Sequence, residues 1–205
     1  MAAYLTDLSA AELQRRLGDA LTVYVQAMGY PSGTERLRAA MWLEHSRRAH
    51  WSAAAVLDVP ADGHLGPVRP AHPSRAALAR APLIGVAYGY RGSPDQWWQQ
   101  QVTQGLERLG WDNEQIRALT GDYFELTELH IHPRAQGHGL GEALTRRLLA
   151  GRTESHVLLS TPEAPGEGNR AWQLYRRLGF TDVIRGYHFA GDPRPFAILG
   201  RPLPL

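Results

Sequence analysis

The stretch Leu129–Gly141, LHIHPRAQGHGLG, decides the fold. Its apolar, strand-like start stops at Pro133, and Gly137, Gly139 and Gly141 then alternate with other residues ahead of a helix-like pattern. Glycines let backbone N–H groups approach a ligand closely, and a helix N-terminus adds unpaired N–H groups and the positive end of its dipole. The pattern therefore predicts a site for phosphate oxygens, and with it a phosphorylated cofactor.

Two common phosphate-binding loops are excluded by composition and spacing. A Walker-type loop needs a lysine after its last glycine, whereas all 22 basic residues of this chain are arginines. A dinucleotide-binding loop needs G-x-G-x-x-G, but the glycines that begin at Gly137 follow G-x-G-x-G. A glycine-rich turn without a ligand is the remaining structural alternative.

Two segments together carry a family resemblance. The run Gln136–Gly141 resembles the acetyl-CoA loop of the GCN5-related N-acetyltransferases (the GNAT family), Q/R-x-x-G-x-G/A. The later segment Asn169–Phe180 resembles the family's second element through Asn169, Ala171, Tyr175 and its Gly-Phe ending. Asn169 suits a helix N-cap, and Gly179 suits a left-handed helix end.

The resemblance implies a fold, an activity and a set of site residues. The expected fold is α/β: a single GNAT-like domain over residues 1–205, with a central mixed sheet and helices on both faces. The expected activity is transfer of an acetyl group from acetyl-CoA to a primary amine by direct attack. The resemblance implies cofactor contacts for Leu129, Ile131, Gln136, Gly137, His138, Gly139, Leu140, Gly141 and Asn169, and makes Tyr175 the proton donor to the departing thiolate.

A general base is sought on the strand before the loop, because an alkylamine is mostly protonated at neutral pH. Glu125 and Glu128 are the candidates. Their odd spacing predicts opposite faces of the strand, and we favour Glu125 because some family members carry a base at that position. A structural hydrogen bond or salt bridge is the alternative for either carboxylate.

The rest of the chain reads as a mixture of helices and strands. Hydrophobic spacing predicts one helix over 9–28 and a second over 34–48 with Leu37, Ala40 and Met41 facing inward. Prolines predict an irregular loop over about 60–82, and residues 93–120 have a helical tendency. The expected strands span 51–59, 83–90, 123–132, 181–189 and 195–199.

Composition narrows the possible partners. The net charge is +2 and the basic residues do not cluster, which argues against a nucleic-acid partner. The chain has no cysteine, which excludes disulfides, thiolate zinc sites and cysteine nucleophiles. It has no evident signal peptide and no long apolar run, so we expect a cytoplasmic protein without a membrane partner. The expected acceptor is a small-molecule or peptide amine, and the sequence is compatible with a homodimer.

Several aromatic and histidine side chains have two possible interpretations, one functional and one structural. His130, His132 and His138 lie close in sequence, but no acidic residue completes a recognised metal pattern, so we expect no metal. Tyr88, Tyr90, Trp97 and Trp98 belong either to the core or to the acceptor site. A non-catalytic acyl-CoA-binding or regulatory module is the alternative function, and a wider acyl donor is a further one.

Overall fold

The computed structural model describes residues 2–59 and 74–205, and its strands there form a seven-stranded mixed sheet in the order β1-β2-β3-β4-β5-β7-β6. β4 and β5 are parallel, whereas the pairs β1/β2, β5/β7 and β6/β7 are antiparallel. The expected mixed sheet is confirmed. The strands are β1 (Ala2–Leu8), β2 (Ser52–Val59), β3 (Leu83–Arg91), β4 (Tyr123–Ile131), β5 (His156–Pro162), β6 (Thr181–Tyr187) and β7 (Phe196–Pro202).

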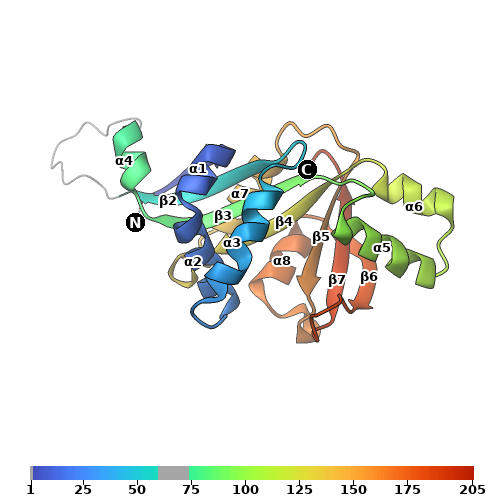
Figure 1. Cartoon of the computed structure of the whole chain (residues 1–205). Coiled ribbons are helices and arrows are strands. Elements are labelled where there is room, and N and C mark those ends of the chain that lie inside the picture. The colour runs from blue at the N-terminus through green and yellow to red at the C-terminus, as the bar shows by residue number, and fades with distance from the viewer. Residues whose placement is uncertain (1, 60–73) are drawn as a thin grey trace. The chain divides into compact units, whose positions relative to one another are not determined.

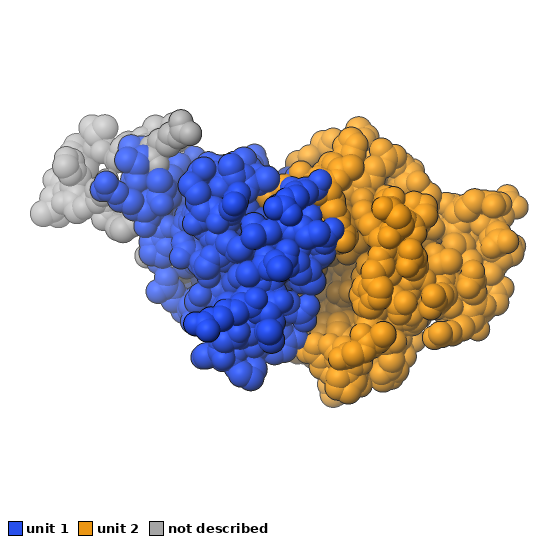
Figure 2. All heavy atoms as spheres, viewed as in Figure 1, with its two compact units in different colours: residues 1–47, 52–88, 128–148 blue, residues 48–51, 89–127, 149–205 orange. Residues whose placement is uncertain are grey.

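Helices and short helical turns connect these strands (Figure 1). They are α1 (Ala10–Arg15), α2 (Leu17–Met28), α3 (Thr34–His45), α4 (Arg75–Arg80), α5 (Trp97–Arg108), α6 (Asn113–Thr120), α7 (Leu140–Leu149), α8 (Arg170–Arg177), and the turns η1 (Pro133–Ala135) and η2 (Pro165–Glu167). The chain divides into two compact units, coloured separately in Figure 2. Unit 1 comprises residues 1–47, 52–88 and 128–148, and unit 2 comprises residues 48–51, 89–127 and 149–205.

Unit 1 has helices on both faces of its strands. A Cβ added to Gly85 of β3 would lie 3.3 Å from the Leu144 side chain of α7. Tyr88, three residues further along β3, contacts Trp42 of α3 at a ring-centroid distance of 4.9 Å. Residues at odd spacing on a strand point to opposite faces, so α3 and α7 cover opposite faces, as their sides of the ribbon in Figure 1 also indicate.

Unit 2 has a core of its own between α5 and the strands. Trp98, Val102 and Leu106 of α5 lie in one buried cluster with side chains of β5, β6 and β7. The Trp98 indole N–H also donates a hydrogen bond of 3.2 Å to Ser160 Oγ of β5. This packing confirms the helical tendency expected for residues 93–120, which form α5 and α6.

The N-terminal region corrects two expectations. The single helix expected over 9–28 is two helices that meet at Arg16, whose guanidinium donates to the Ala81 carbonyl at 2.7 Å and to Asp19 at 3.1 Å. β1 was not expected. It forms by pairing along its whole length with residues 53–59 of β2, and such non-local pairing leaves little local signal in a short strand.

The inward face expected for the second helix is also wrong. Leu37 is 81% exposed, whereas Trp42 and His45 are the buried residues of α3. The large indole buries more apolar surface than the smaller side chains do, so it sets the orientation of the helix.

Part of the proline-rich segment is regular. Residues 60–73 lie outside the described residues, but Arg75–Arg80 form α4 after the cap Ser74. The expectation of one domain over residues 1–205 stays a prediction.

The close approach of β3 and β4 in unit 2 generates a stability prediction. A Cβ on Gly89 would lie 2.1 Å from the Glu125 carbonyl oxygen and 2.6 Å from the Phe124 ring. We expect Gly89→Ala to lower the free energy of unfolding by about 1–3 kcal/mol or more, measured by urea denaturation. Gly18→Ala is the control, because its added Cβ meets nothing within 4 Å in α2 and the helix gains roughly 0.5–1 kcal/mol. Equal effects in the two variants would contradict the prediction.

Candidate functional site

The glycine loop adopts the backbone that its sequence predicts. Gly137 and Gly139 have φ values of 83° and 74°, a region that residues with a Cβ rarely adopt. α7 begins at Leu140, within the glycine motif, and the N–H of Ala143 donates to the Gly139 carbonyl at 3.1 Å. The N–H groups of residues 140–142 lie before the first hydrogen bond of the helix, so they have no acceptor within it and can bind a ligand.

The loop fits a pyrophosphate of CoA. A Cβ added to Gly139 would meet nothing within 4 Å, so the outer side of the loop is open to a ligand. Hydrogen bonds also fix the conformation of the loop. Gln136 Nε2 donates to the Ile131 carbonyl at 3.0 Å, and His138 Nδ1 lies 3.0 Å from the Gln136 carbonyl. Open N–H groups on a braced loop suit an anion.

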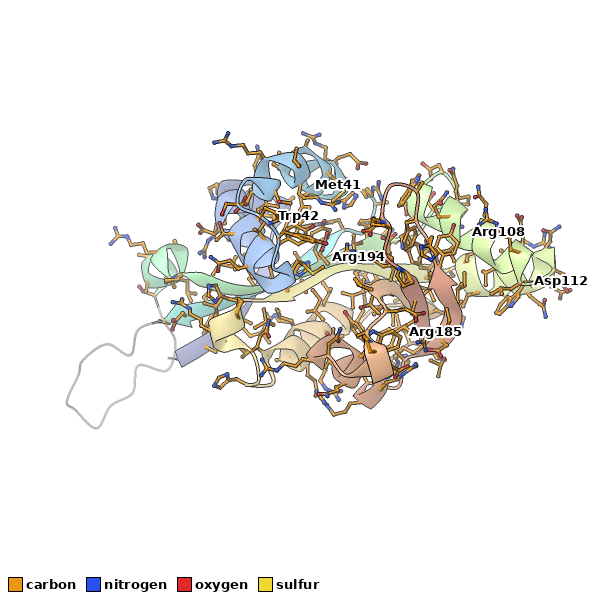
Figure 3. The ribbon with its side chains drawn as sticks, turned by 90° about the horizontal axis from the view of Figure 1, so that it is seen from below. Met41, Trp42, Arg108, Asp112, Arg185 and Arg194 are labelled. Carbon is orange, nitrogen blue, oxygen red and sulfur yellow. The ribbon has the colours of Figure 1, made fainter. Side chains whose placement is uncertain are left out.

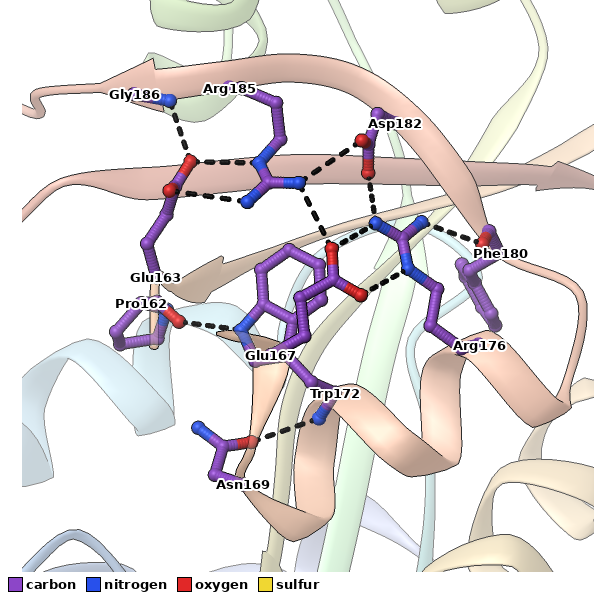
Figure 4. A network of polar contacts seen from close by, with 10 residues as sticks. All are labelled: Pro162, Glu163, Glu167, Asn169, Trp172, Arg176, Phe180, Asp182, Arg185 and Gly186. Carbon is purple, nitrogen blue, oxygen red and sulfur yellow. Dashed lines mark hydrogen bonds and ion pairs between the residues drawn. The ribbon is translucent and has the colours of Figure 1, made fainter. Parts of the chain in front are cut away.

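α8 also forms as its sequence predicts. Asn169 Oδ1 accepts the Trp172 N–H at 2.9 Å (Figure 4). Gly179 ends the helix with a φ of 80°. The cap occupies the side-chain oxygen of Asn169 and leaves its amide NH₂ to donate. Tyr175 is 7% exposed, and its ring contacts Phe180 edge-on at 5.6 Å.

A network of charged side chains holds the start of α8 (Figure 4). Arg176 bonds to Glu167 and Asp182, each at 2.6 Å. Arg185 of β6 bonds to Glu163 at 2.9 Å, Glu167 at 3.0 Å and Asp182 at 3.1 Å. The two guanidinium groups also lie over the ring of buried Trp172, at 5.0 and 4.7 Å. The network joins the segment before α8, the helix and β6.

This network generates a pH prediction. Its bond from Arg185 lowers the pKa of the Glu163 carboxyl, and Arg176 does the same for Glu167. A carboxyl with a lowered folded-state pKa contributes stability above its unfolded pKa, and this contribution is lost as the pH falls through the folded-state value. We therefore expect Arg185→Gln to lower the urea midpoint at about pH 7 and to lose its effect near pH 3.

The control for this prediction is Arg146→Gln, which removes one exposed i,i+4 pair with Glu142 on α7. Such a pair contributes about 0.3–0.5 kcal/mol. A deficit in Arg185→Gln that is the same at both pH values would show that the carboxylates do not cause it.

Glu125 is buried in unit 2. It is 3% exposed, and its Oε1 accepts the Tyr90 hydroxyl at 3.1 Å and the Thr127 hydroxyl at 3.3 Å. Burial, and next the Glu125 charge, raise the pKa of the Tyr90 hydroxyl, so Tyr90 stays protonated as the donor. The carboxylate therefore holds the Tyr90 side chain in place.

Glu128 has a different partner, in unit 1. Its Oε2 lies 2.5 Å from His130 Nε2, with side-chain exposures of 15% for the carboxylate and 9% for the imidazole. His130 contacts Tyr24 of α2 edge-on at 4.9 Å and stacks on Trp42 of α3 at 6.4 Å. Figure 3 shows Trp42 on α3. Sequence reasoning missed this pairing; the spacing of two residues on one strand was its only signal.

The contacts that β3 makes do not sort Glu125 and Glu128 by a simple alternation of side chains along β4. Tyr88 and Tyr90 are two residues apart on β3, the spacing that puts side chains on one face. Tyr88 contacts Trp42, a neighbour of His130, whereas Tyr90 contacts Glu125. The role of either carboxylate stays a prediction.

The remaining sequence candidates divide between core and surface. Tyr88, Tyr90 and Trp98 are buried, whereas Trp97 is 51% exposed. Within residues 2–59 and 74–205, no group of three or more His, Cys, Asp or Glu side chains is arranged to hold a metal ion. No helix in the same part of the chain is long and apolar enough to cross a membrane.

The predicted site residues fall in both units. Glu128, Leu129, Ile131 and the glycine loop belong to unit 1, whereas Glu125, Asn169 and Tyr175 belong to unit 2. Within each unit the local geometry agrees with the sequence. The ligand contacts and catalytic roles of these residues stay predictions.

Comparison with known proteins identifies the family. Residues 102–182 match the model of an acetyltransferase (GNAT) domain. The GCN5-like protein acetyltransferase of Mycobacterium tuberculosis is 66% identical over 206 residues, covering 100% of both chains.

Solved structures share the fold at low sequence identity. A putative GNAT-family acetyltransferase from Desulfovibrio desulfuricans has a TM-score of 0.60 at 12% identity, with 98% of this chain and 99% of that one covered. NAA60 of Arabidopsis thaliana in complex with acetyl-CoA has a TM-score of 0.58 at 13% identity, with 98% and 99% covered. With the full-length relative, these matches show that the chain belongs to the GNAT family and is an acetyltransferase.

Proposed function

We propose that this acetyltransferase moves the acetyl group of acetyl-CoA directly onto a primary amine of a protein. The observation that carries the proposal is the glycine loop, whose positive-φ glycines and open helix N-terminus suit the pyrophosphate. The choice of a protein acceptor is supported by the relative that is 66% identical and is described as a protein acetyltransferase.

The bound cosubstrate supplies an activated thioester, and the chain's own residues supply the rest. The N–H groups of the loop and of the first turn of α7 hold the pyrophosphate. Backbone groups at Leu129 and Ile131, with the Asn169 amide, hold the pantetheine arm. Polarised N–H groups on the strand stabilise the oxyanion that forms when the amine attacks.

Proton transfer completes the reaction. The attacking amine must lose a proton, and the carboxylates of β4, Glu125 and Glu128, are the candidate acceptors. The thiolate that leaves gains a proton from the Tyr175 hydroxyl. Tyr175 suits this role because its ring is fixed against Phe180 on a helix that the charged network holds.

The test of the acceptor class is a thiol-release assay. Its panel comprises peptides with one lysine and a blocked N-terminus, peptides with a free N-terminus and no lysine, and small alkylamines. Because the chain contains no lysine, any acetylated lysine side chain found after the reaction belongs to the added acceptor. We expect turnover of peptides. Turnover of small amines alone would overturn the protein acceptor, and CoA binding without any thiol release would favour the non-catalytic alternative.

The loop's role generates a binding prediction. Gly139→Asp places a carboxylate where the phosphates are expected, so we expect the thermal stabilisation by CoA to be lost. The φ of 74° also strains any side chain there. Gly151→Asp is the matched control, because Gly151 has a φ of 71° and equally open space. Both variants should lose some intrinsic stability, but only Gly139→Asp should lose the response to CoA.

Tyr175 generates a kinetic prediction. Tyr175→Phe keeps the ring and its contact with Phe180 but removes the proton donor. Because general acid catalysis is typically worth about 10²–10⁴-fold, we expect kcat to fall within that range while CoA affinity changes little. An unchanged kcat with a working acceptor would remove Tyr175 from the mechanism.

A further inference from the structure

We propose that His130, held by Glu128, is the group that accepts the proton of the acceptor amine. The inference rests on the proposed function and names the base of that reaction. It begins with an observation that the sequence did not predict: the carboxylate and imidazole of these two residues lie 2.5 Å apart, nearly buried, within unit 1.

The contact determines which imidazole nitrogen can act. The nitrogen that faces the carboxylate is Nε2, so Nε2 carries the hydrogen that it donates to Glu128. Nδ1 is then the basic nitrogen, and within the described residues it makes no hydrogen bond. A carboxylate that fixes one tautomer and stabilises the imidazolium is the arrangement by which other enzymes make histidine an effective base.

The surroundings favour a functional pair over a structural one. His130 lies against Tyr24 and Trp42, and Trp42 has a fully buried indole N–H with no partner among the described residues. A buried polar pair is weak evidence for stability, because apolar side chains of similar volume often serve as well. Mostly aromatic walls with a few convergent polar groups are typical of ligand sites.

Exposure indicates where the amine would enter. Trp42 is 0% exposed and Tyr24 is 4% exposed, whereas the side chains of Glu128 and His130 are 15% and 9% exposed. The pair is thus one of the edges of this cluster that reach solvent; another lies at Tyr30 and Arg38, which contact Tyr24 and are half-buried. It is also flanked in the chain by Leu129 and Ile131, whose backbone groups are proposed to hold the acyl arm.

Each bond that forms or breaks in the proposed step, and each proton that moves, has a named donor and acceptor. The amine nitrogen forms a bond to the thioester carbonyl carbon and passes one proton to His130 Nδ1, while Glu128 stays ionised and accepts from Nε2. The carbon–sulfur bond then breaks, and the sulfur leaves as a thiolate that takes a proton from Tyr175. His130 then releases its proton to water and the Tyr175 phenolate takes one back from water, so both side chains return to their starting protonation states. His130 is the catalytic residue of this step, and Glu128 is its positioning residue.

Binding gives the first test, without turnover. The probes are CoA and a conjugate in which the CoA sulfur is joined through a carbonylmethyl bridge to the side-chain nitrogen of lysine in a blocked peptide. That amide N–H occupies the place of the acceptor amine. We expect His130→Gln to bind CoA as the wild type does and to bind the conjugate up to about tenfold more weakly.

The matched control is His132→Asn. His132 is the next histidine on the chain, and its Nδ1 accepts the Arg134 N–H at 3.2 Å, a contact that an asparagine oxygen preserves. This variant should bind both probes as the wild type does. Equal weakening of CoA and conjugate by His130→Gln, or no weakening of either, would overturn the proposal.

Turnover and rescue give the second test, with an acceptor found by thiol release. We expect His130→Gln to lower kcat by about 10²–10⁴-fold with little change in the KM of the amine. Glu128→Gln should cause a smaller loss in kcat. Added imidazole should restore part of the rate of His130→Ala but none of the rate of Glu128→Gln, an outcome that a purely structural role would not produce. An unchanged kcat in His130→Gln would overturn the proposal.

The two tests separate this proposal from the proposed function. A wild-type protein that binds both probes but acetylates no amine would contradict the function, and the binding comparison would still decide whether His130 faces the acceptor nitrogen. His130→Gln covers the case in which His130→Ala fails to fold.

Discussion

The placement of the proposed chemistry depends on the alternation of small and large side chains along β3. Gly85, Ala87 and Gly89 share one face of this strand, and Tyr88 and Tyr90 share the other. The glycines allow close approach, since a Cβ on Gly89 would overlap the Glu125 carbonyl and one on Gly85 would lie 2.8 Å from the Ile131 side chain. On the other face, the tyrosines contact Trp42 and Glu125. One strand thus holds β4 close and also supplies partners for buried polar groups.

The features that sequence predicts well are those whose cause is local. Gly137, Gly139 and Gly179 are needed because their backbone φ is positive, and Asn169 is needed because a helix start needs an acceptor for its N–H groups. Each requirement is met within a few residues, so a short motif reveals it. The burial of Tyr175 has a local cause too, because its helical spacing from Ala171 and Leu178 predicts the buried face of α8, whereas its role as proton donor is implied only by the family resemblance.

The features that sequence reasoning missed depend on packing between distant segments. β1 exists because it pairs with β2, and the break at Arg16 accompanies a bond to the Ala81 carbonyl. The Glu128–His130 pair is the instructive case. Two residues at strand spacing share a face in any strand, but only the packing of α2 and α3 decides that this face is aromatic and nearly closed to water. It is this burial that makes the Glu128–His130 pair a candidate proton acceptor.

Because the chain contains no lysine, arginine makes all of its side-chain ion pairs other than those of histidine, and arginine does not act as an amine nucleophile. Every ion pair that holds α8 uses arginine, whose planar fork bonds to several carboxylates at once, as Arg185 does with Glu163, Glu167 and Asp182. A guanidinium keeps its proton at any physiological pH, whereas a lysine ammonium can lose one and attack a thioester. Since the chain has no lysine, it carries no side-chain amine that the proposed reaction could modify. The charges around Tyr175 and Asn169 come from arginine, a basic side chain that does not react with the acetyl thioester of the proposed cosubstrate.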